Sequence, residues 1–159
     1  MKIAIYPGTF DPITNGHLDI IQRAVHIFDQ VIVSVAKKTT KGKSLFSEKE
    51  RIKLIQQSIL EIPSIEVDSF EGLMIDHAKK HSAHAAIRGL RALSDFEYEF
   101  QMALMNRSLN KEVSTVFLMP HAKYTHISSS MVREVASLGG DVSKYVPTHV
   151  DQALKKQYK

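Results

Sequence analysis

The segment from Tyr6 to His17 most constrains the fold, because it places a glycine- and proline-rich turn between an apolar run, Ile3–Tyr6, and a helical pattern. Apolar residues follow the turn at helical spacing, in Leu18, Ile21, Val25 and Phe28. A strand, a turn and a helix in this order favour a parallel α/β sheet, in which such turns lie at the carboxyl edge where ligands bind. Free N–H groups and the positive end of the helix dipole at that edge suit an anion such as phosphate.

The rest of the chain repeats this alternation, which is typical of an α/β fold with a parallel sheet. We expect strands at Lys2–Tyr6, Gln30–Ala36, Ile65–Val67, His84–Ile87 and Thr115–Met119. We expect helices at Gly16–Phe28, from Ser47 to Ile59, at Gly72–Lys80, after Ser94, at Ser128–Leu138 and from near Pro147. With 159 residues, this order predicts a single domain over residues 1–159 with a doubly wound five-stranded parallel sheet.

Two segments, Ser47–Glu50 and Ser94–Glu97, have the Ser-x-x-Glu form of a capping box and predict helix starts. The long helix after the second segment carries apolar residues at the spacing of a buried stripe, namely Phe96, Phe100, Leu104 and Met105. The apolar residues of this helix exceed what one core needs, so we interpret the stripe as core or as an interface between subunits.

Composition narrows the class of protein. The absence of cysteine excludes disulfides and thiolate metal sites and agrees with a reducing compartment, so we expect a cytoplasmic protein. No run of 18 apolar residues occurs and the first residues enter a predicted strand, so we expect neither a membrane span nor a secretory signal. The net charge of +4 gathers in a lysine-rich loop at residues 37–43 and in the C-terminal tail, which disfavours a nucleic-acid-binding face.

Three motifs carry a resemblance to a known family. The segments Gly8–Asp11 and Thr14–His17 are similar to the T/H-x-G-H signature of the nucleotidylyltransferase superfamily, and Ile127–Arg133 is similar to its second phosphate-binding motif. Between them lie Ile87–Arg91 and Asp95–Glu99, and in this order the motifs resemble the bacterial phosphopantetheine adenylyltransferase family over nearly the whole chain. The resemblance implies a Rossmann-like nucleotidyltransferase fold. It also implies transfer of an adenylyl group from ATP to 4′-phosphopantetheine, which yields dephospho-coenzyme A and pyrophosphate.

The resemblance also implies roles for individual residues. The residues implied in catalysis are His17, Thr9, Lys41, Arg88 and Arg91. Those implied to bind the acceptor are Thr9, Lys41, Leu73, Met74 and Arg88. Those implied to bind ATP are Thr9, Phe10, His17, Gly89, Leu90, Arg91, Glu99, Tyr124, Thr125, His126, Ile127, Ser128, Ser129 and Ser130. Within these sets, His17 is implied to contact the nucleotide phosphates and to stabilise the transition state, whereas Lys41 and Arg88 hold the acceptor phosphate.

The implied reaction needs no covalent enzyme intermediate, because the acceptor phosphate attacks the α-phosphorus of ATP directly and pyrophosphate leaves in line. The protein must then supply alignment and compensation of phosphoryl charge. The resemblance implies Mg²⁺ as a cofactor, held largely by phosphate oxygens and water, and no protein residue is assigned to a metal. It further implies coenzyme A as a feedback ligand and assembly as a homohexamer.

Several cationic residues fit more than one role. In the loop around Lys41, Lys43 or Lys38 could take the part of Lys41. Arg88 and Arg91 fit phosphate contacts, and they also fit surface ion pairs with Asp95 or Glu97.

Other residues also keep two interpretations. Glu99 fits either an exposed helix charge or a nucleotide contact, and Ser128–Ser130 fit a helix N-cap as well as phosphate binding. His77 and His81 have the spacing of a zinc pair on a helix, but the sequence offers no evident third ligand, so we assign no zinc site.

Three other functions fit parts of the pattern. One is the same chemistry with another acceptor, as in a cytidylyltransferase. A second is a non-catalytic sensor of nucleotide or coenzyme A, because a fold alone does not prove activity. A third, an RNA-binding relative, rests only on the isoelectric point of about 9.2.

Overall fold

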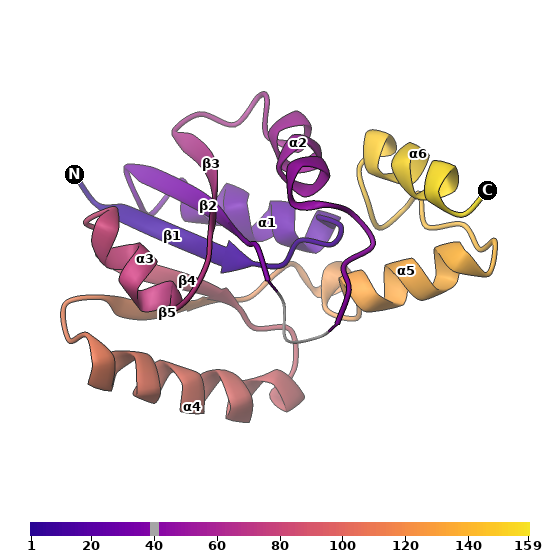
Figure 1. The fold of residues 1–159 in the computed structure, drawn as a ribbon. Helices are drawn as coiled ribbons and strands as arrows, with labels where there is room; N and C mark the ends of the chain where they lie inside the picture. Colours follow the sequence, from indigo (N-terminus) through magenta and orange to yellow (C-terminus); the bar gives the residue numbers. More distant parts are fainter. Residues whose placement is uncertain (39–41) are drawn as a thin grey trace.

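The computed structural model describes residues 1–38 and 42–159, and in them five parallel strands form one sheet with helices on both faces (Figure 1). The strands are β1 (Ile3–Gly8), β2 (Gln30–Ala36), β3 (Ile65–Phe70), β4 (Ala85–Gly89) and β5 (Ser114–Leu118). The helices are α1 (Asn15–Ala24), α2 (Glu48–Ser58), α3 (Met74–Lys80), α4 (Leu93–Leu109), α5 (Ser129–Ser137) and α6 (Thr148–Gln157), with a 3₁₀ turn, η1, at Ala122–Tyr124. The predicted fold class is confirmed. None of these helices is long and apolar enough to cross a membrane.

The strand order is β3-β2-β1-β4-β5, so β1 lies at the centre and the winding direction changes between β1 and β4. Ala4 of β1 pairs with Val31 of β2 on one side and with Ala85 of β4 on the other. Because all strands are parallel, the turns that follow β1 and β4 emerge next to each other at the carboxyl edge. A doubly wound sheet binds its ligands at this switch point.

Residues of β1 alternate between two cores, because helices cover both faces of the sheet. Ala4 and Tyr6 belong to the larger core, together with Ile21 of α1 and Ile55 of α2. Ile5 belongs to a smaller core beneath α3. The central strand is therefore buried on both sides, which fixes the position of the turn that follows it.

Helix α1 begins at Asn15, one residue before the predicted Gly16, with Thr14 as its N-cap. The helix ends at Ala24 and not at the predicted Phe28, because the N–H groups of Ile27 and Phe28 both donate to the Ala24 carbonyl and close a turn. The capping box before α2 is confirmed, since the Ser47 hydroxyl accepts from the Glu50 N–H at 3.3 Å and the Glu50 carboxylate accepts from the Ser47 N–H at 2.7 Å.

The prediction for α4 is wrong in two respects. The helix begins at Leu93 with Ala92 as N-cap and no side-chain cap, because the Asp95 carboxylate accepts from Arg91. Of the two interpretations of its apolar stripe, the core is wrong, since Phe96, Phe100, Leu104 and Met105 are 45–57% exposed, and the subunit interface stays a prediction. Glu99 is the buried residue of this helix, so the side of α4 that faces the sheet serves the cleft and the apolar side faces outward.

Candidate active site

A cleft of about 650 Å³ opens at the carboxyl edge of the sheet, at the switch point between β1 and β4. Most of the predicted site residues line it: Thr9, Phe10, His17, Leu73, Met74, Arg88, Gly89, Arg91, Glu99, Tyr124, Ile127, Ser128, Ser129 and Ser130. They come from turns after four different strands and meet because parallel strands end on the same edge. Phe10 contributes little side-chain surface, since its ring is buried between Tyr6 and His17.

Four predicted residues do not take such a position. Lys41 lies outside the described residues. Leu90, Thr125 and His126 are not among the described residues that line the cleft. The Leu90 N–H continues the sheet by donating to Leu118, and the His126 ring packs against Tyr145 at 5.6 Å. Roles for these four residues stay predictions.

The two alternatives to Lys41, Lys38 and Lys43, both line the cleft. The Lys38 ammonium is 2.5 Å from the Glu71 carboxylate, in an ion pair whose partners are both largely exposed. An exposed pair of this kind contributes little energy, so Lys38 can exchange Glu71 for a ligand phosphate.

His17 has a fixed ring orientation because it is the third residue of α1 and takes part in the capping of that helix. Its Nδ1 accepts a hydrogen bond from the Thr14 backbone N–H at 3.0 Å, while the Thr14 hydroxyl accepts from the His17 N–H at 3.4 Å. A nitrogen that accepts from a backbone N–H carries no proton, so the neutral ring carries its proton on Nε2. His17 therefore presents an uncharged donor to the cleft.

The electrostatics of the cleft keep this ring neutral. Burial, and then the positive charges of Arg91 and Arg88, lower the pKa of His17 to about 4. At neutral pH the ring can donate a hydrogen bond to a phosphoryl oxygen without a change in its protonation state. Such a preorganised donor is suited to stabilising charge that develops on a phosphoryl group.

Arg88, at the end of β4, is held by a two-pronged ion pair with Glu99 of α4. Its Nε lies 2.9 Å from one carboxylate oxygen and its Nη2 lies 2.7 Å from the other, while Nη1 donates to the Pro7 carbonyl at 3.2 Å. The interpretation of Glu99 as an exposed helix charge is wrong, because Glu99 is buried. Glu99 thus holds the Arg88 guanidinium beside the carboxyl end of β1.

Arg91 pairs with Asp95 one helical turn later, and not with Glu97. Its Nε lies 3.1 Å from the Asp95 carboxylate, and its Nη1 donates to the Ile127 carbonyl at 3.0 Å. Arg91 therefore links the turn after β4 to the segment that leads into α5. The motifs Ile87–Arg91 and Ile127–Arg133 therefore meet at this contact.

The serine segment Ser128–Ser130 forms the start of α5, which opens onto the cleft. Ser128 is the N-cap and accepts from the Met131 N–H at 3.1 Å, and the Ser129 hydroxyl donates to the Pro12 carbonyl at 2.7 Å. Capping and phosphate binding are compatible, because the N–H groups of the first turn that lack an intrahelical partner remain available to an anion.

Sequence reasoning missed two residues that tie the cleft together, Asp11 and Arg133. Asp11 is buried, and its two carboxylate oxygens accept from the N–H groups of Leu45 at 2.8 Å and Phe46 at 2.9 Å, which ties the segment that leads into α2 to the turn after β1. Arg133 of α5 donates to the Asp11 carbonyl at 2.5 Å. Both residues belong to the quoted motifs, so their position in the motif was the available signal.

Arg51 was also missed, since it lies in α2 outside every motif. It is 2% exposed, and its Nη1 donates to the carbonyls of Thr9 at 2.7 Å and Ala36 at 2.9 Å. It therefore joins the ends of β1 and β2 beneath the cleft. In the sequence, Arg51 looks like any charged residue of an amphipathic helix, so nothing there predicted that it would be buried beneath the cleft.

The arrangement can bind two phosphate-bearing molecules, because cations and N–H donors surround one cleft. Every carboxylate that lines the described part of the cleft is already engaged, Asp11 by two backbone N–H groups, Asp95 by Arg91 and Glu99 by Arg88. These carboxylates therefore do not form a magnesium cage, which takes free oxygen ligands.

Comparisons with known proteins agree with this geometry. A family model described as cytidylyltransferase-like matches residues 5–135. A phosphopantetheine adenylyltransferase of Alkaliphilus metalliredigens is 57% identical over 157 residues, 99% of this chain and 99% of the relative. One of Desulfosudis oleivorans is 54% identical over 157 residues, 99% of this chain and 93% of the relative. The crystal structure of a bifunctional NMN adenylyltransferase/ADP ribose pyrophosphatase from Francisella tularensis covers 98% of this chain and 49% of that longer chain, with a TM-score of 0.74; at 16% identity it shows the fold alone.

Proposed function

This chain belongs to the cytidylyltransferase-like family and, within it, to the phosphopantetheine adenylyltransferases, and on that premise we propose that it transfers the adenylyl group of ATP to 4′-phosphopantetheine. The products are dephospho-coenzyme A and pyrophosphate. The observation that carries the proposal is the meeting of His17, Arg88, Arg91 and the start of α5 in one cleft of a chain with such relatives.

The chemistry we propose is a direct displacement. An oxygen of the acceptor phosphate forms a bond to the α-phosphorus of ATP, the bond to the bridging oxygen breaks, and pyrophosphate leaves in line. His17 donates its Nε2–H to an α-phosphate oxygen and transfers no proton. Arg91 and the N–H groups at the start of α5 compensate the charge of the leaving pyrophosphate, and Arg88, oriented by Glu99, holds the acceptor phosphate.

Magnesium enters this proposal as an ion bound to ATP. The engaged carboxylates of the described cleft do not fit a protein-held ion, whereas the phosphate oxygens of ATP and water are the hard ligands that Mg²⁺ prefers. The residues of the chain supply the remaining positive charge. Lys38 and Lys43, which line the cleft, would add to this charge, and Lys41, which follows Lys38 in the sequence and lies outside the described residues, is proposed to do the same.

The acceptor arm and the assembly complete the proposal. Leu73 and Met74 border the cleft next to the end of β3 and offer apolar surface to the pantetheine chain. Coenzyme A, which contains the same arm, would compete there as a feedback ligand.

The exposed apolar face of α4 supports a homo-oligomer, with the hexamer as the expected size. Sedimentation velocity tests the assembly, and a sole monomer at micromolar concentration would contradict it.

The activity has a direct test. Pyrophosphate release is measured with ATP and Mg²⁺, with and without 4′-phosphopantetheine, and the product is identified by mass. We expect release only when both substrates are present, together with dephospho-coenzyme A. CTP in place of ATP and nicotinamide mononucleotide in place of the acceptor are the controls for other members of the superfamily. Turnover of either control in preference to the proposed pair, or no turnover at saturation, would overturn the proposal.

A further inference from the structure

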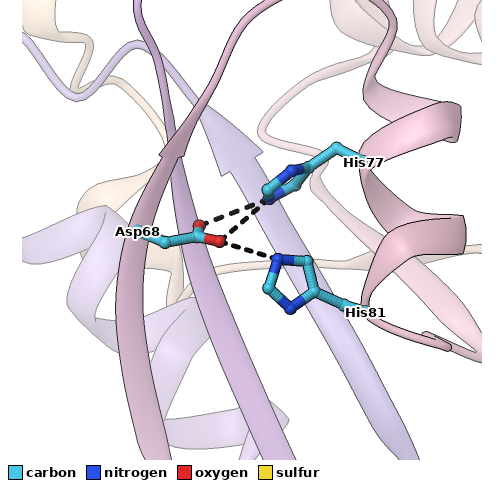
Figure 2. Close-up of side chains that lie close together, drawn as sticks. All are labelled: Asp68, His77 and His81. Carbon is cyan, nitrogen blue, oxygen red and sulfur yellow. Dashed lines mark hydrogen bonds and ion pairs between the residues drawn. The ribbon is translucent and has the colours of Figure 1, made fainter.

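A cluster of three side chains outside the cleft has the composition of a metal site (Figure 2). Asp68 comes from the edge strand β3, His77 lies in α3, and His81 is the C-cap residue of that helix, four positions later. We propose that Asp68, His77 and His81 bind a divalent transition-metal ion of the zinc class, and that this ion clamps α3 to β3. The sequence showed the spacing of the two histidines, and the fold supplies the third ligand.

The distances suit such an ion. Nε2 of His77 lies 3.1 Å from Oδ2 of Asp68, and Nε2 of His81 lies 2.9 Å from the same oxygen. All three ligand atoms lie within 4.8 Å of one another. In a tetrahedral zinc site with bonds of about 2.0–2.1 Å, ligand atoms lie about 3.3 Å apart. The two carboxylate–imidazole distances are already close to this value, so side-chain adjustments can convert the hydrogen-bonded cluster into a coordinated one.

The fold brings these three side chains together on one face of the sheet. Asp68 is the register partner of Ser34 on β2, so both side chains lie on the face of the sheet that α3 covers. His77 is buried, with its ring stacked on Phe70 at 5.0 Å and its Nε2 3.1 Å from the Ser34 hydroxyl. A ring held in this way loses little freedom when it binds an ion.

The remaining coordination position faces solvent. The side chains of Asp68 and His81 are 28% and 31% exposed, so a water molecule can reach the ion and complete four ligands. Two imidazoles and one carboxylate suit zinc or cobalt better than magnesium or calcium, which take oxygen ligands. To bind the ion, each neutral ring would carry its proton on Nδ1 and offer the lone pair of Nε2.

The position of the cluster indicates a structural role. Phe70 at the end of β3 and Leu73 and Met74 at the start of α3 border the cleft, whereas the three ligands lie farther back along the same two elements. An ion at the cluster would hold this wall of the cleft in place without touching the reacting groups. The inference does not depend on the proposed reaction, because the ligands lie outside the cleft.

The test uses the full chain after dialysis against EDTA, titrated with zinc chloride by calorimetry. We expect one zinc per chain, and with cobalt chloride the visible bands of a tetrahedral site. The variant His81→Gln keeps a side-chain N–H for Asp68 but removes the imidazole, so it should fold and lose about 100-fold in zinc affinity. His26→Ala removes an exposed histidine elsewhere and should bind zinc as the unmodified chain does.

A second measurement separates a bound ion from a merely folded cluster. Zinc should raise the melting temperature of the unmodified chain and of His26→Ala, and this rise should vanish in His81→Gln. After removal of zinc by EDTA, and with Mg²⁺ supplied in excess of any remaining chelator, the three proteins should share the same kcat for pyrophosphate release, because His81 lies outside the cleft. Equal zinc affinity in His81→Gln and the unmodified chain, or no zinc binding by the latter, would overturn the proposal.

Discussion

Helices α1 and α4 follow the two neighbouring strands at the switch point, and both begin at the cleft, yet they relate to the rest of the chain in opposite ways (Figure 1). α1 buries Ile20, Ile21 and Ala24 in the larger core. α4 buries Glu99 and leaves large apolar side chains such as Phe100 exposed. Apolar spacing on a helix therefore predicts an apolar face but not the surface that covers it.

The two helix starts differ in the same way. α1 is capped by its own residues, because Thr14 and His17 exchange hydrogen bonds. α4 has no side-chain cap, and its first turn is held through Asp95 by the cleft residue Arg91. Each helix thus gives the cleft one kind of group: α1 presents His17 directly, whereas α4 presents Glu99, which orients Arg88.

The largest expected effect is a difference in the free energy of unfolding between a variant in α1 and a variant in α4. Ile21→Ala in α1 should lower the free energy of unfolding by about 2–5 kcal/mol, because it leaves a cavity in the core. Phe100→Ala in α4 should change that free energy by less than about 1 kcal/mol in the dilute chain, since its ring is 47% exposed. Urea denaturation measures both, and sedimentation shows whether Phe100→Ala weakens assembly. Equal losses of stability would break the comparison.

The next effect concerns the direct role of α1 in the cleft. His17→Ala should lower kcat by about 10²–10³-fold while the affinity for ATP changes much less, because the Nε2–H acts most strongly on the transition state. Single-turnover kinetics and equilibrium binding of ATP measure the two quantities. A parallel loss in kcat and ATP affinity would instead place His17 in ground-state binding.

The corresponding test for α4 is Glu99→Gln, which removes the charge that orients Arg88. We expect the KM for 4′-phosphopantetheine to rise about 10–100-fold, since a hydrogen bond to a charged group contributes about 1.5–3 kcal/mol. The KM for ATP should change less. Glu97→Gln, on the exposed side of the same helix, is the matched control. A rise limited to the KM for ATP would contradict the acceptor role of Arg88.

The pH dependence of stability should expose the lowered pKa of His17. The unfolded chain binds a proton at this ring below pH 6.5, whereas the folded chain binds it only near pH 4, so the unfolded state gains protons first as the pH falls. The stability difference between the unmodified chain and His17→Gln should therefore shrink by about 1–2 kcal/mol between pH 7 and pH 5. Parallel pH profiles would contradict a neutral His17.

The smallest expected effect concerns the caps. Thr14→Ala should cost about 1 kcal/mol, because it removes the N-cap hydroxyl of α1. Ala92→Ser should add a few tenths to about 1 kcal/mol at α4, since Ala92 already has the extended backbone of an N-cap residue. Thermal unfolding measures both. A loss on Ala92→Ser would show that Arg91 and Asp95 leave no room for a conventional cap.

Much of the cleft was predictable from the sequence. The strand Gln30–Ala36 has the predicted bounds, and His17, Arg88 and Ser128–Ser130 lie where the motifs placed them, because strand ends of a parallel sheet share one edge. The support beneath the site was not predictable. Arg51 reaches Thr9 across 42 positions of sequence, and no local pattern encodes so distant a partner.

The sequence by itself determined the alternation of elements, the helix start at Ser47 and the residue types at the strand ends, because these depend on neighbours a few positions apart. Tertiary structure alone decided three other features: that α4 turns its apolar face outward, that Glu99 pairs with Arg88, and that Asp68 lies beside His77 and His81. Each depends on which face of one element meets another, and that choice is set by the packing of the whole sheet.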